Sequence, residues 1–487
     1  MSEQPFTPPR FTLPANWQSV AVLFAGAEFT DEILPALLRP ARWFGGKAHL
    51  LSQVRAVASL TVGDSSAGRI FLLEASYADR SPETYVLPLQ IAPAAPEKAT
   101  VLAHLQGGVL FDALYDSAFR DALLEMILRE QNLRDTIGIC GATLKAASAG
   151  LTLPLNSQPL AAEQSNSAIL YGGRFFLKLY RKPEEGEKPD AELIRFLSER
   201  QQFKHVPAFC GAIEHWIPLA PQPRTLALLV AHVPNEGDAW AFTLAHMNDA
   251  DYPARARQLG QRTAGMHLAL AADLENPAFA PEPFTDEDQH ALCEATRTAT
   301  RQTLALLEKK LPEIPAGKRA EAEALLARAG EIAAKLSAFE QCKISTTKTR
   351  HHGDYHLGQV QNTGDDFVII DFEGEPARTL AERRMKRSPL RDVAGMLRSF
   401  HYAAHSVPEP SEAWVKNISR IFLESWLATA KGASFIPDDP QTFRALLEVH
   451  LLEKAIYEIS YELNHRPDWV SIPVLGVLQI LDDGIAP

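Results

Sequence analysis

Short apolar runs separated by turn residues dominate the first part of the chain. Three such runs, Val54–Leu60, Arg69–Ser76 and Thr84–Leu89, are rich in β-branched and large apolar residues. Gly, Asp, Ser and Pro residues separate them, and this combination is typical of strands joined by turns. The pattern therefore predicts a small antiparallel sheet near the N-terminus.

A second group of strand-like runs follows. Ser167–Tyr171 and Arg174–Tyr180 are joined by Gly172-Gly173. A two-glycine link is a strong hairpin signal, because both residues of such a turn need positive φ. A helix over Asp190–Gln201 and a strand over Thr225–Val230 come next. This block is predicted to form a second sheet with one accompanying helix.

Apolar residues recur at helical spacing in most of the remaining chain. The segment 233–240, VPNEGDAW, marks a turn or hinge before this helical half, and residues 349–375 interrupt it. The predicted helices span Phe111–Arg129, Ala254–Ala271, Ala320–Gln341 and Phe443–Leu463. We therefore expect three parts, at residues 1–90, 91–233 and 234–487.

Composition places the chain among ordinary globular proteins. It has 487 residues, of which 46% are apolar and 22% are charged, and this length suggests two to four domains. The net charge of −12 argues against nucleic acid or an anionic membrane surface as the main partner, because phosphate neutralisation needs surplus Lys and Arg. A local basic pocket for a small anion is compatible with it.

Cysteine spacing and the N-terminus predict a cytoplasmic location. The four cysteines are widely spaced, so they form neither a CxxC pair nor a compact zinc motif. The first ten residues, MSEQPFTPPR, lack the basic and apolar regions of a signal peptide. No run of about 18 apolar residues occurs. We expect neither export nor membrane insertion.

The most informative stretch is residues 350–359, RHHGDYHLGQ, followed at 366–374 by DFVIIDFEG. Gln359 lies five residues after Asp354, and Asp371 lies seventeen residues after it. This is the layout of a kinase catalytic loop followed by a strand that delivers a metal-binding carboxylate. Asp354 would orient the attacking hydroxyl and accept its proton, while Gln359 and Asp371 would offer the hard oxygen atoms that Mg²⁺ prefers. Each motif is weak alone, and their joint spacing carries the prediction.

A kinase also needs a cation at the nucleotide phosphates, and Lys178 on the second predicted hairpin is the candidate. Glu192, on the following helix, could hold this lysine in place. The chain has no GxGxxG loop, so Lys178 as a solvated hairpin lysine and Glu192 as an exposed helix carboxylate stay open as alternatives. The other groups that could reach phosphates or adenine belong to Ser165, Asn166, Ala231 and Val233.

These segments resemble the maltokinases, which are aminoglycoside-phosphotransferase-like members of the eukaryotic-type kinase group. The similarity covers residues 352–360, 368–404, 163–182, 233–240 and 451–478, and the motif RWFGGK at 42–47 resembles the start of the maltokinase cap. The resemblance implies an α+β, bilobal protein-kinase-like fold. It would comprise a mixed-sheet N-terminal cap over 1–90, a sheet-rich ATP lobe over 91–233 and a mainly helical C-terminal lobe over 234–487.

The resemblance also implies an activity, the ATP- and Mg²⁺-dependent phosphorylation of maltose at its anomeric hydroxyl, which feeds α-glucan synthesis from trehalose. Asp354 would be the base, Gln359 and Asp371 the Mg²⁺ ligands, Lys178 the phosphate lysine and Glu192 its partner. The sugar pocket would be lined by His356, Tyr402, Glu458 and Arg466, with Glu458 and Arg466 paired. Asp392 would brace the catalytic loop, and a separate trehalose synthase is an expected partner.

Two other functions remain open at this stage. A kinase of another sugar or amino sugar, such as glucosamine, shares the same cap and core motifs. A non-catalytic kinase-fold protein is less consistent with the sequence, because such a protein has no need to keep Lys178, Asp354, Gln359 and Asp371 together. The helix face that carries Glu458 and Tyr461 could line a sugar pocket, and it could equally pack against another helix.

Overall fold

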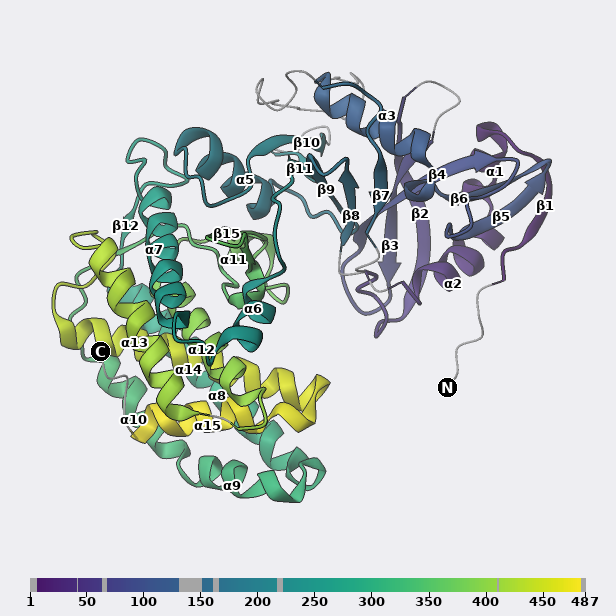
Figure 1. Cartoon of the computed structure of the whole chain (residues 1–487). Helices are drawn as coiled ribbons and strands as arrows, with labels where there is room; N and C mark the ends of the chain where they lie inside the picture. The colour runs from purple at the N-terminus through teal and green to yellow at the C-terminus, as the bar shows by residue number, and fades with distance from the viewer. Residues whose placement is uncertain are drawn as a thin grey trace. The chain divides into compact units, whose positions relative to one another are not determined.

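The structure is a computed structural model that describes residues 7–41, 43–63, 68–130, 151–160, 166–216, 222–409 and 411–482. The chain forms two compact units (Figure 1). The first comprises Met1–Arg195 and Pro207–Pro234, and the second comprises Phe196–Val206 and Asn235–Pro487. Each unit is described by itself.

The first unit begins with a six-stranded sheet in the order β1-β5-β6-β4-β3-β2. Neighbouring strands are antiparallel except β1 and β5, which are parallel. The sheet thus extends to Asp112, beyond the boundary expected at residue 90. The strands are β1 (Arg10–Pro14), β2 (Leu51–Thr61), β3 (Arg69–Tyr77), β4 (Glu83–Ala92), β5 (Val101–Gln106) and β6 (Gly108–Asp112). The helices are α1 (Trp17–Ala25), α2 (Leu34–Leu38) and α3 (Ser117–Leu128), with a π-helix at Glu28–Ile33.

A second sheet of the same unit has the order β10-β11-β9-β8-β7 and is antiparallel throughout. The predicted hairpin is present between β8 and β9, where Gly172 and Gly173 have φ of +55° and +65°. The elements are β7 (Ser157–Pro159), β8 (Asn166–Tyr171), β9 (Phe175–Tyr180), α5 (Pro189–Arg195), β10 (Phe209–His215) and β11 (Arg224–Ala231). The helix predicted to continue to Gln201 changes into a π-helix at Phe196–Arg200.

The two sheets of the first unit share one hydrophobic core. Leu72 and Val86 of the first sheet belong to the same buried cluster as Leu177 and Leu229 of the second. Arg181, directly after β9, donates to Asp112 Oδ2 at 3.0 Å, and its carbonyl accepts from the backbone N–H of Val86 at 2.8 Å. The first sheet is therefore packed onto the second as part of one body.

The second unit is mainly helical. Its helices are α6 (Ala239–His246), α7 (Tyr252–Leu270), α8 (Asp286–Lys310), α9 (Arg319–Ala327), α10 (Ala329–Glu340), α11 (Leu380–Arg384), α12 (Leu390–His405), α13 (Glu412–Thr429), α14 (Pro440–His465) and α15 (Ser471–Asp482). Two short antiparallel pairs join β12 (Glu282–Pro283) to β13 (Thr347–Lys348), which are far apart in the chain, and β14 (Val360–Asn362) to β15 (Phe367–Ile369), which form a hairpin. Among the described helices, none is both long and apolar enough to cross a membrane.

Two predicted helices differ from the structure in their bounds. The helix expected from Phe111 starts only at Ser117, because Asp112 and Asp116 cap successive turns with their side chains and break the periodicity. The helix expected over Ala320–Gln341 is divided at Arg328, which caps the C-terminus of α9. Helix α12, by contrast, is buried along nearly its whole length and forms the centre of the unit.

Candidate active site

The predicted catalytic loop lies between β13 and a 3₁₀ turn at Leu357–Gln359. Gly353 begins the sharp part of this loop with φ of +91°, and a Cβ placed there would lie 3.2 Å from the Cα of Gly374. Gly374 itself has φ of +72°. Only glycine combines this backbone conformation with such a close approach. The two glycines therefore let the catalytic loop touch the segment that follows β15.

Asp392 braces the loop, as predicted. Its carboxylate accepts hydrogen bonds from the backbone N–H of His352 at 2.7 Å and of Gly353 at 2.9 Å. His267 Nε2 donates to the same carboxylate at 3.0 Å, because its Nδ1 accepts from the Trp426 indole N–H. Burial raises the pKa of Asp392, but the hydrogen bond from His267 and the field of neighbouring histidines outweigh it and hold the pKa far below its usual range. The loop backbone is thus fixed by a buried carboxylate on α12.

The hairpin β14–β15 brings Gln359 and Asp371 to one end of the site. Val360 pairs with Ile369, and the backbone N–H of Ile370 donates to the Gln359 carbonyl at 3.0 Å. Asp371 has φ of +65°, a conformation that costs energy for a residue with a side chain and that occurs mostly at functional sites. The register explains why two residues twelve positions apart lie next to each other.

His352 connects the catalytic loop to this hairpin. Its Nε2 donates to the Ile370 carbonyl at 2.9 Å, and its ring packs against Phe372 at a centroid distance of 4.7 Å. The backbone N–H of Asp354 donates to Nδ1 of the same ring at 3.4 Å, so one imidazole connects Asp354 to Ile370, the residue before Asp371.

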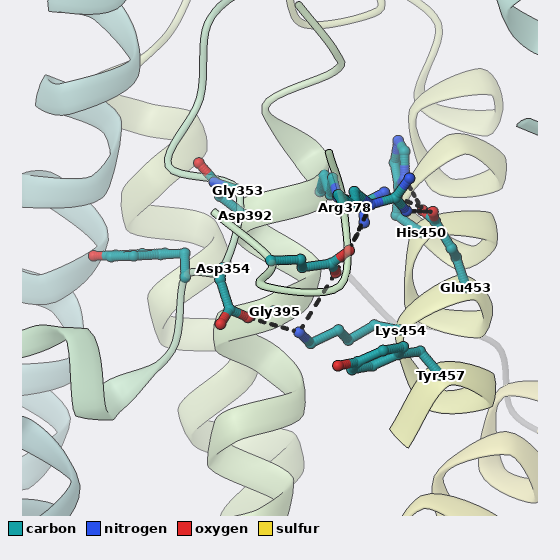
Figure 2. A pocket seen from close by; sticks show the side chains of 12 residues that line it. Gly353, Asp354, Arg378, Asp392, Gly395, His450, Glu453, Lys454 and Tyr457 are labelled. Atoms are coloured by element: carbon teal, nitrogen blue, oxygen red, sulfur yellow. Dashed lines mark hydrogen bonds and ion pairs between the residues drawn. The ribbon is translucent and has the colours of Figure 1, made fainter. Parts of the chain in front are cut away.

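Asp354 faces a lysine from the last long helix (Figure 2). Lys454 Nζ on α14 donates to Asp354 Oδ1 at 3.0 Å, and the two side chains are 19% and 24% exposed. Burial raises the pKa of Asp354, but the charge of Lys454 reverses this and lowers the pKa overall. The carboxylate is therefore ionised at neutral pH and can accept a hydrogen bond or a proton.

Behind Lys454, the pocket wall is a network of buried charges (Figure 2). Arg391 donates to Glu375 at 2.9 Å and to Glu453 at 2.6 Å, and Arg378 donates to Glu375 at 2.6 Å. Lys454 Nζ is 3.9 Å from Glu375. Burial raises the pKa of Glu453, but Arg391 and His450 reverse this and hold it well below the usual range. The network keeps Lys454 charged and fixed beside Asp354.

The residues expected at the nucleotide lie on the first unit. Lys178 Nζ on β9 donates to Asp190 Oδ2 at 2.9 Å, and Tyr180 Oη donates to the same oxygen at 3.0 Å. Asp190 is absent from the predicted set. Glu192 lies two residues further on α5 and is buried, so the alternative of an exposed helix carboxylate is wrong. Its pairing with Lys178 stays a prediction.

The other described residues expected to reach phosphates or adenine lie on or near β8 and β11, and one of them takes part in backbone hydrogen bonding. The N–H of Ala231 donates to the Ala208 carbonyl at 2.8 Å, so this residue can offer a ligand only its carbonyl. Asn166 starts β8, and Val233 follows β11. Ser165 lies outside the described residues. Adenine recognition by this segment stays a prediction.

Three of the four residues expected around the sugar lie on α12, on α14 and directly after α14. Arg466 pairs with Glu462, donating at 2.7 and 2.9 Å, and Tyr402 Oη donates to the same carboxylate at 3.1 Å. Glu458 accepts from Arg398 at 2.9 Å. The expected pairing of Arg466 with Glu458 is therefore wrong, because Glu462 lies one helical turn before Arg466 and Arg398 reaches Glu458 from α12.

His356 remains close to the catalytic base in the chain and serves the loop itself. Its Nδ1 accepts from the backbone N–H of Gly358 at 3.1 Å and so caps the 3₁₀ turn that presents Gln359. Burial lowers the pKa of His356, which keeps the ring neutral. Its Nε2 then carries the proton and can donate to a ligand.

Sequence reasoning missed two contacts of the site, Lys454 with Asp354 and Lys178 with Asp190. In each case the partners are separated along the chain, by 100 and 12 residues. The available signal is weak, because a lysine on an amphipathic helix is usually a solvated residue. The surrounding acidic residues, Glu453 beside Lys454 and Asp190 beside Glu192, were the usable hint.

Comparison with known proteins agrees with this geometry. The model of the phosphotransferase enzyme family matches residues 157–416, and that of the maltokinase N-terminal cap domain matches residues 38–117. A glucosamine kinase of Streptacidiphilus jiangxiensis is 27% identical over 345 residues, which are 66% of this chain and 73% of that protein. A glucosamine kinase of Mycolicibacterium smegmatis is 27% identical over 347 residues, covering 67% and 80%.

Solved structures show the same fold. A glucosamine kinase in complex with glucosamine, ADP and inorganic phosphate has a TM-score of 0.68 at 23% identity, covering 96% of this chain and 99% of the other. A second crystal form of glucosamine kinase also gives 0.68 at 23% identity, covering 91% and 97%. The α+β kinase-like fold predicted from the sequence is confirmed. The chain belongs to the phosphotransferase enzyme family and carries an N-terminal cap of the maltokinase type.

Proposed function

We propose that this phosphotransferase is an ATP- and Mg²⁺-dependent maltokinase, which transfers a phosphoryl group to the anomeric hydroxyl of maltose. The observation that supports it most is the ionised Asp354 on a braced loop beside Lys454. A positioned carboxylate of this kind orients an acceptor hydroxyl and takes its proton as the phosphoryl group is transferred. The match to the maltokinase cap model is consistent with maltose as the acceptor, although kinases of other sugars share this cap.

The acceptor side of the reaction follows from Asp354. Because Lys454 lowers its pKa, the carboxylate needs no further activation near neutral pH. One carboxylate oxygen, Oδ1, is held by Lys454. The other carboxylate oxygen is the atom that would accept the hydrogen bond of the sugar hydroxyl.

The nucleotide side rests on Lys178 and on the oxygen ligands at the β14–β15 hairpin. The residues present fit Mg²⁺, because the Gln359 amide oxygen and the Asp371 carboxylate are hard ligands held next to each other by strand pairing. When bound there, Mg²⁺ would neutralise charge on the nucleotide phosphates. Lys178, fixed by Asp190, would bind phosphate oxygens of ATP directly.

The charges around Asp354 favour a neutral sugar over an amino sugar as the acceptor. Every described carboxylate that lines the pocket already has a cationic or N–H partner: Asp354, Glu375, Asp392 and Glu453. An ammonium group would have to compete with Lys454 or Arg391 for these carboxylates. Neutral hydroxyls need no such exchange, because they can donate to carboxylates that stay paired.

Glucosamine is the second candidate, since two relatives of this chain are glucosamine kinases. An amino sugar would need a carboxylate partner for its ammonium group, and Glu458 is the candidate among the residues expected around the sugar. Burial raises the pKa of Glu458 even though Arg398 contacts it, so this carboxyl is less committed to its charged form than Glu453 on the same helix. It would be the group to replace if glucosamine proved to be the acceptor.

The experiment is an ADP-release assay with maltose, glucose, glucosamine and trehalose, with and without Mg²⁺. We expect turnover with maltose and none without Mg²⁺. Asp354→Asn should lower kcat by orders of magnitude and leave ATP binding intact, whereas the exposed control Asp438→Asn should behave as wild type. If glucosamine is the only one of these sugars that is turned over, the acceptor is glucosamine and not maltose. Full activity of Asp354→Asn would rule out Asp354 as the base. Absence of turnover with every sugar would favour a non-catalytic kinase-fold protein.

We also propose a separate trehalose synthase as a partner, because the product of that enzyme would be the substrate here. Sedimentation of the mixed proteins tests this directly. A faster boundary than either protein gives alone is the expected result, and unchanged boundaries at micromolar concentrations would contradict a stable complex.

A further inference from the structure

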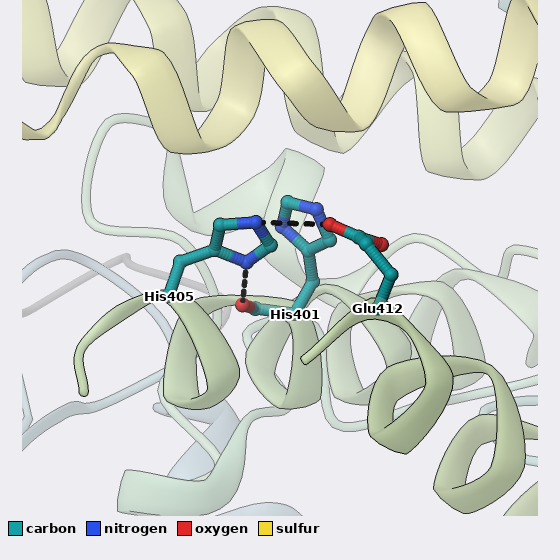
Figure 3. A group of neighbouring side chains, drawn as sticks. All are labelled: His401, His405 and Glu412. Atoms are coloured by element: carbon teal, nitrogen blue, oxygen red, sulfur yellow. Dashed lines mark hydrogen bonds and ion pairs between the residues drawn. The ribbon is translucent and has the colours of Figure 1, made fainter. Parts of the chain in front are cut away.

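The end of α12 and the beginning of α13 bring together three side chains that take no part in the site above (Figure 3). His401 and His405 lie four residues apart on α12, so they share one helix face. Glu412 is the first residue of α13. One potential ligand atom from each of the three lies within 4.8 Å of those of the other two.

The contact between His405 and Glu412 needs a positive charge between the two groups. His405 Nδ1 donates to the His401 carbonyl at 2.9 Å, so this nitrogen carries a hydrogen. The other nitrogen, Nε2, is 3.1 Å from Glu412 Oε1. In a neutral ring Nε2 would present a lone pair to the carboxylate, which is repulsive. Either a second proton or a bound cation must therefore be present.

His401 distinguishes these two possibilities. Its side chain is 3% exposed, and neither ring nitrogen has a hydrogen-bond partner among the described residues. The side chain of Gln479 lies near the ring and can serve one of its nitrogens. A proton on His405 satisfies the pair with Glu412 but leaves His401 with an unsatisfied buried nitrogen, which is costly. A cation bound by all three residues satisfies His405 Nε2, Glu412 and one nitrogen of His401, and the second nitrogen of His401 can then donate to Gln479.

The orientation of His405 is the one found in metal sites. Histidines that bind metals commonly donate their second ring nitrogen to a backbone carbonyl, which fixes the tautomer, and His405 does so through Nδ1. In a tetrahedral site with bonds of about 2.0–2.1 Å, neighbouring ligand atoms are about 3.4 Å apart. The separation between His405 and Glu412 is close to this, and a rotation of the His401 ring would bring its nitrogen nearer.

We propose that His401, His405 and Glu412 bind one divalent transition cation of the zinc type. Two neutral imidazoles and one carboxylate suit Zn²⁺ and exclude Mg²⁺, which prefers oxygen ligands. The Glu412 side chain is 45% exposed, so water can complete the coordination and the ion has an entry path. The ion would attach the end of α12 to the start of α13. It is distinct from the Mg²⁺ expected at Gln359 and Asp371.

The test uses the tag-free, full-length protein after removal of metals with a chelator. Zn²⁺ binding is measured by competition with a chromophoric chelator, and Co²⁺ is added separately for its visible absorption. We expect one Zn²⁺ per chain, a Co²⁺ spectrum typical of tetrahedral coordination, and a rise in melting temperature with Zn²⁺ but not with Mg²⁺. His405→Ala and Glu412→Gln should each lose at least about tenfold in Zn²⁺ affinity.

A matched control is His290→Ala, which removes an exposed histidine that also pairs with a glutamate, Glu340. This variant should bind Zn²⁺ as wild type does. Glu412→Gln keeps the test decisive if a histidine variant fails to fold, because Glu412 lies at the surface. Absence of stoichiometric Zn²⁺ binding to the wild type, or unchanged affinity in both His405→Ala and Glu412→Gln, would overturn the proposal. Activity is not a readout here, so the result is independent of the proposed function.

Discussion

Replacement of Lys454 by methionine tests how the proposed base is kept ionised. Methionine retains much of the length of the side chain but removes the ammonium group that donates to Asp354 Oδ1 at 3.0 Å. Asp354 would then remain buried without its main cation, and burial alone raises its pKa. The variant should therefore lose activity preferentially at low pH, where Asp354 becomes protonated.

The size of the effect follows from the contact. At 3.0 Å and an effective dielectric constant of about 20, the gross attraction of the pair is about 5 kcal/mol. Much of this is offset by desolvation, and hydrogen bonds to charged groups contribute about 1.5–3 kcal/mol net. Losing that amount makes ionisation of Asp354 roughly 10- to 150-fold less favourable. In Lys454→Met, Asp354 is still ionised at pH 8, so activity there changes little, whereas activity at pH 5 falls because part of Asp354 is protonated.

The assay is the pH profile of kcat/KM from pH 4.5 to 8.5 for the wild type, Lys454→Met and Lys454→Arg. The acid limb should move to higher pH in the methionine variant and stay near its place in the arginine variant. Lys335→Met is the matched control, because Lys335 on α10 forms a comparable ion pair with Glu448 on α14, the helix that carries Lys454. An acid limb that is unchanged in Lys454→Met, or an equal loss of activity at all pH values, would refute this reasoning.

Three further predictions concern the frame around the loop. Arg391→Met should cost about 3–5 kcal/mol of unfolding free energy in urea titrations, because it leaves Glu375 and Glu453 as buried charges, and a loss under 1 kcal/mol would contradict this. The pKa of Asp392 is lowered in the folded state, so its ionised carboxylate stabilises the fold above about pH 4, and this stabilisation is lost as the pH falls below about 3.9. Acid unfolding followed by circular dichroism should therefore lack this pH-dependent contribution in Asp392→Asn. An acid-unfolding curve equal to that of the wild type would contradict the role of Asp392. Gly395→Ala should lower both stability and kcat, because a Cβ there would lie 2.5 Å from the Tyr355 carbonyl oxygen, whereas Gly330→Ala on α10 meets no atom within 4 Å and should be neutral or stabilising; equal melting temperatures of the two variants would contradict the close packing of α12 on the loop.

Local sequence patterns were sufficient for the parts of the site that lie close together in the chain. Gly172-Gly173 predicts its hairpin because the turn itself requires positive φ. Asp354, Gln359 and Asp371 are recognisable because their spacing reflects one loop and one hairpin, and the structure places Gln359 beside the segment of Asp371. Asp392 as a brace is confirmed by its bonds to the loop backbone.

Long-range pairing was not accessible in the same way. The helical periodicity of α14 places Lys454 and Glu458 on one face, but it does not say that Lys454 meets a loop 100 residues earlier. The pairing of Arg466 with Glu462 is local and was overlooked because Glu458 was assigned to Arg466. The choice of partner depends on how α12 packs against α14, since Arg398 on α12 takes Glu458. Packing of this kind is decided by the whole core.

The proposed reaction is phosphoryl transfer from ATP to a sugar with Asp354 as the base. The most direct measurement is ³¹P NMR of the product formed from ATP, Mg²⁺ and maltose by the wild type and by Asp354→Asn. We predict a sugar phosphate whose phosphorus couples to the anomeric proton, formed by the wild type and nearly absent with the variant. A product phosphorylated at another position, or equal product formation by both proteins, would contradict the account.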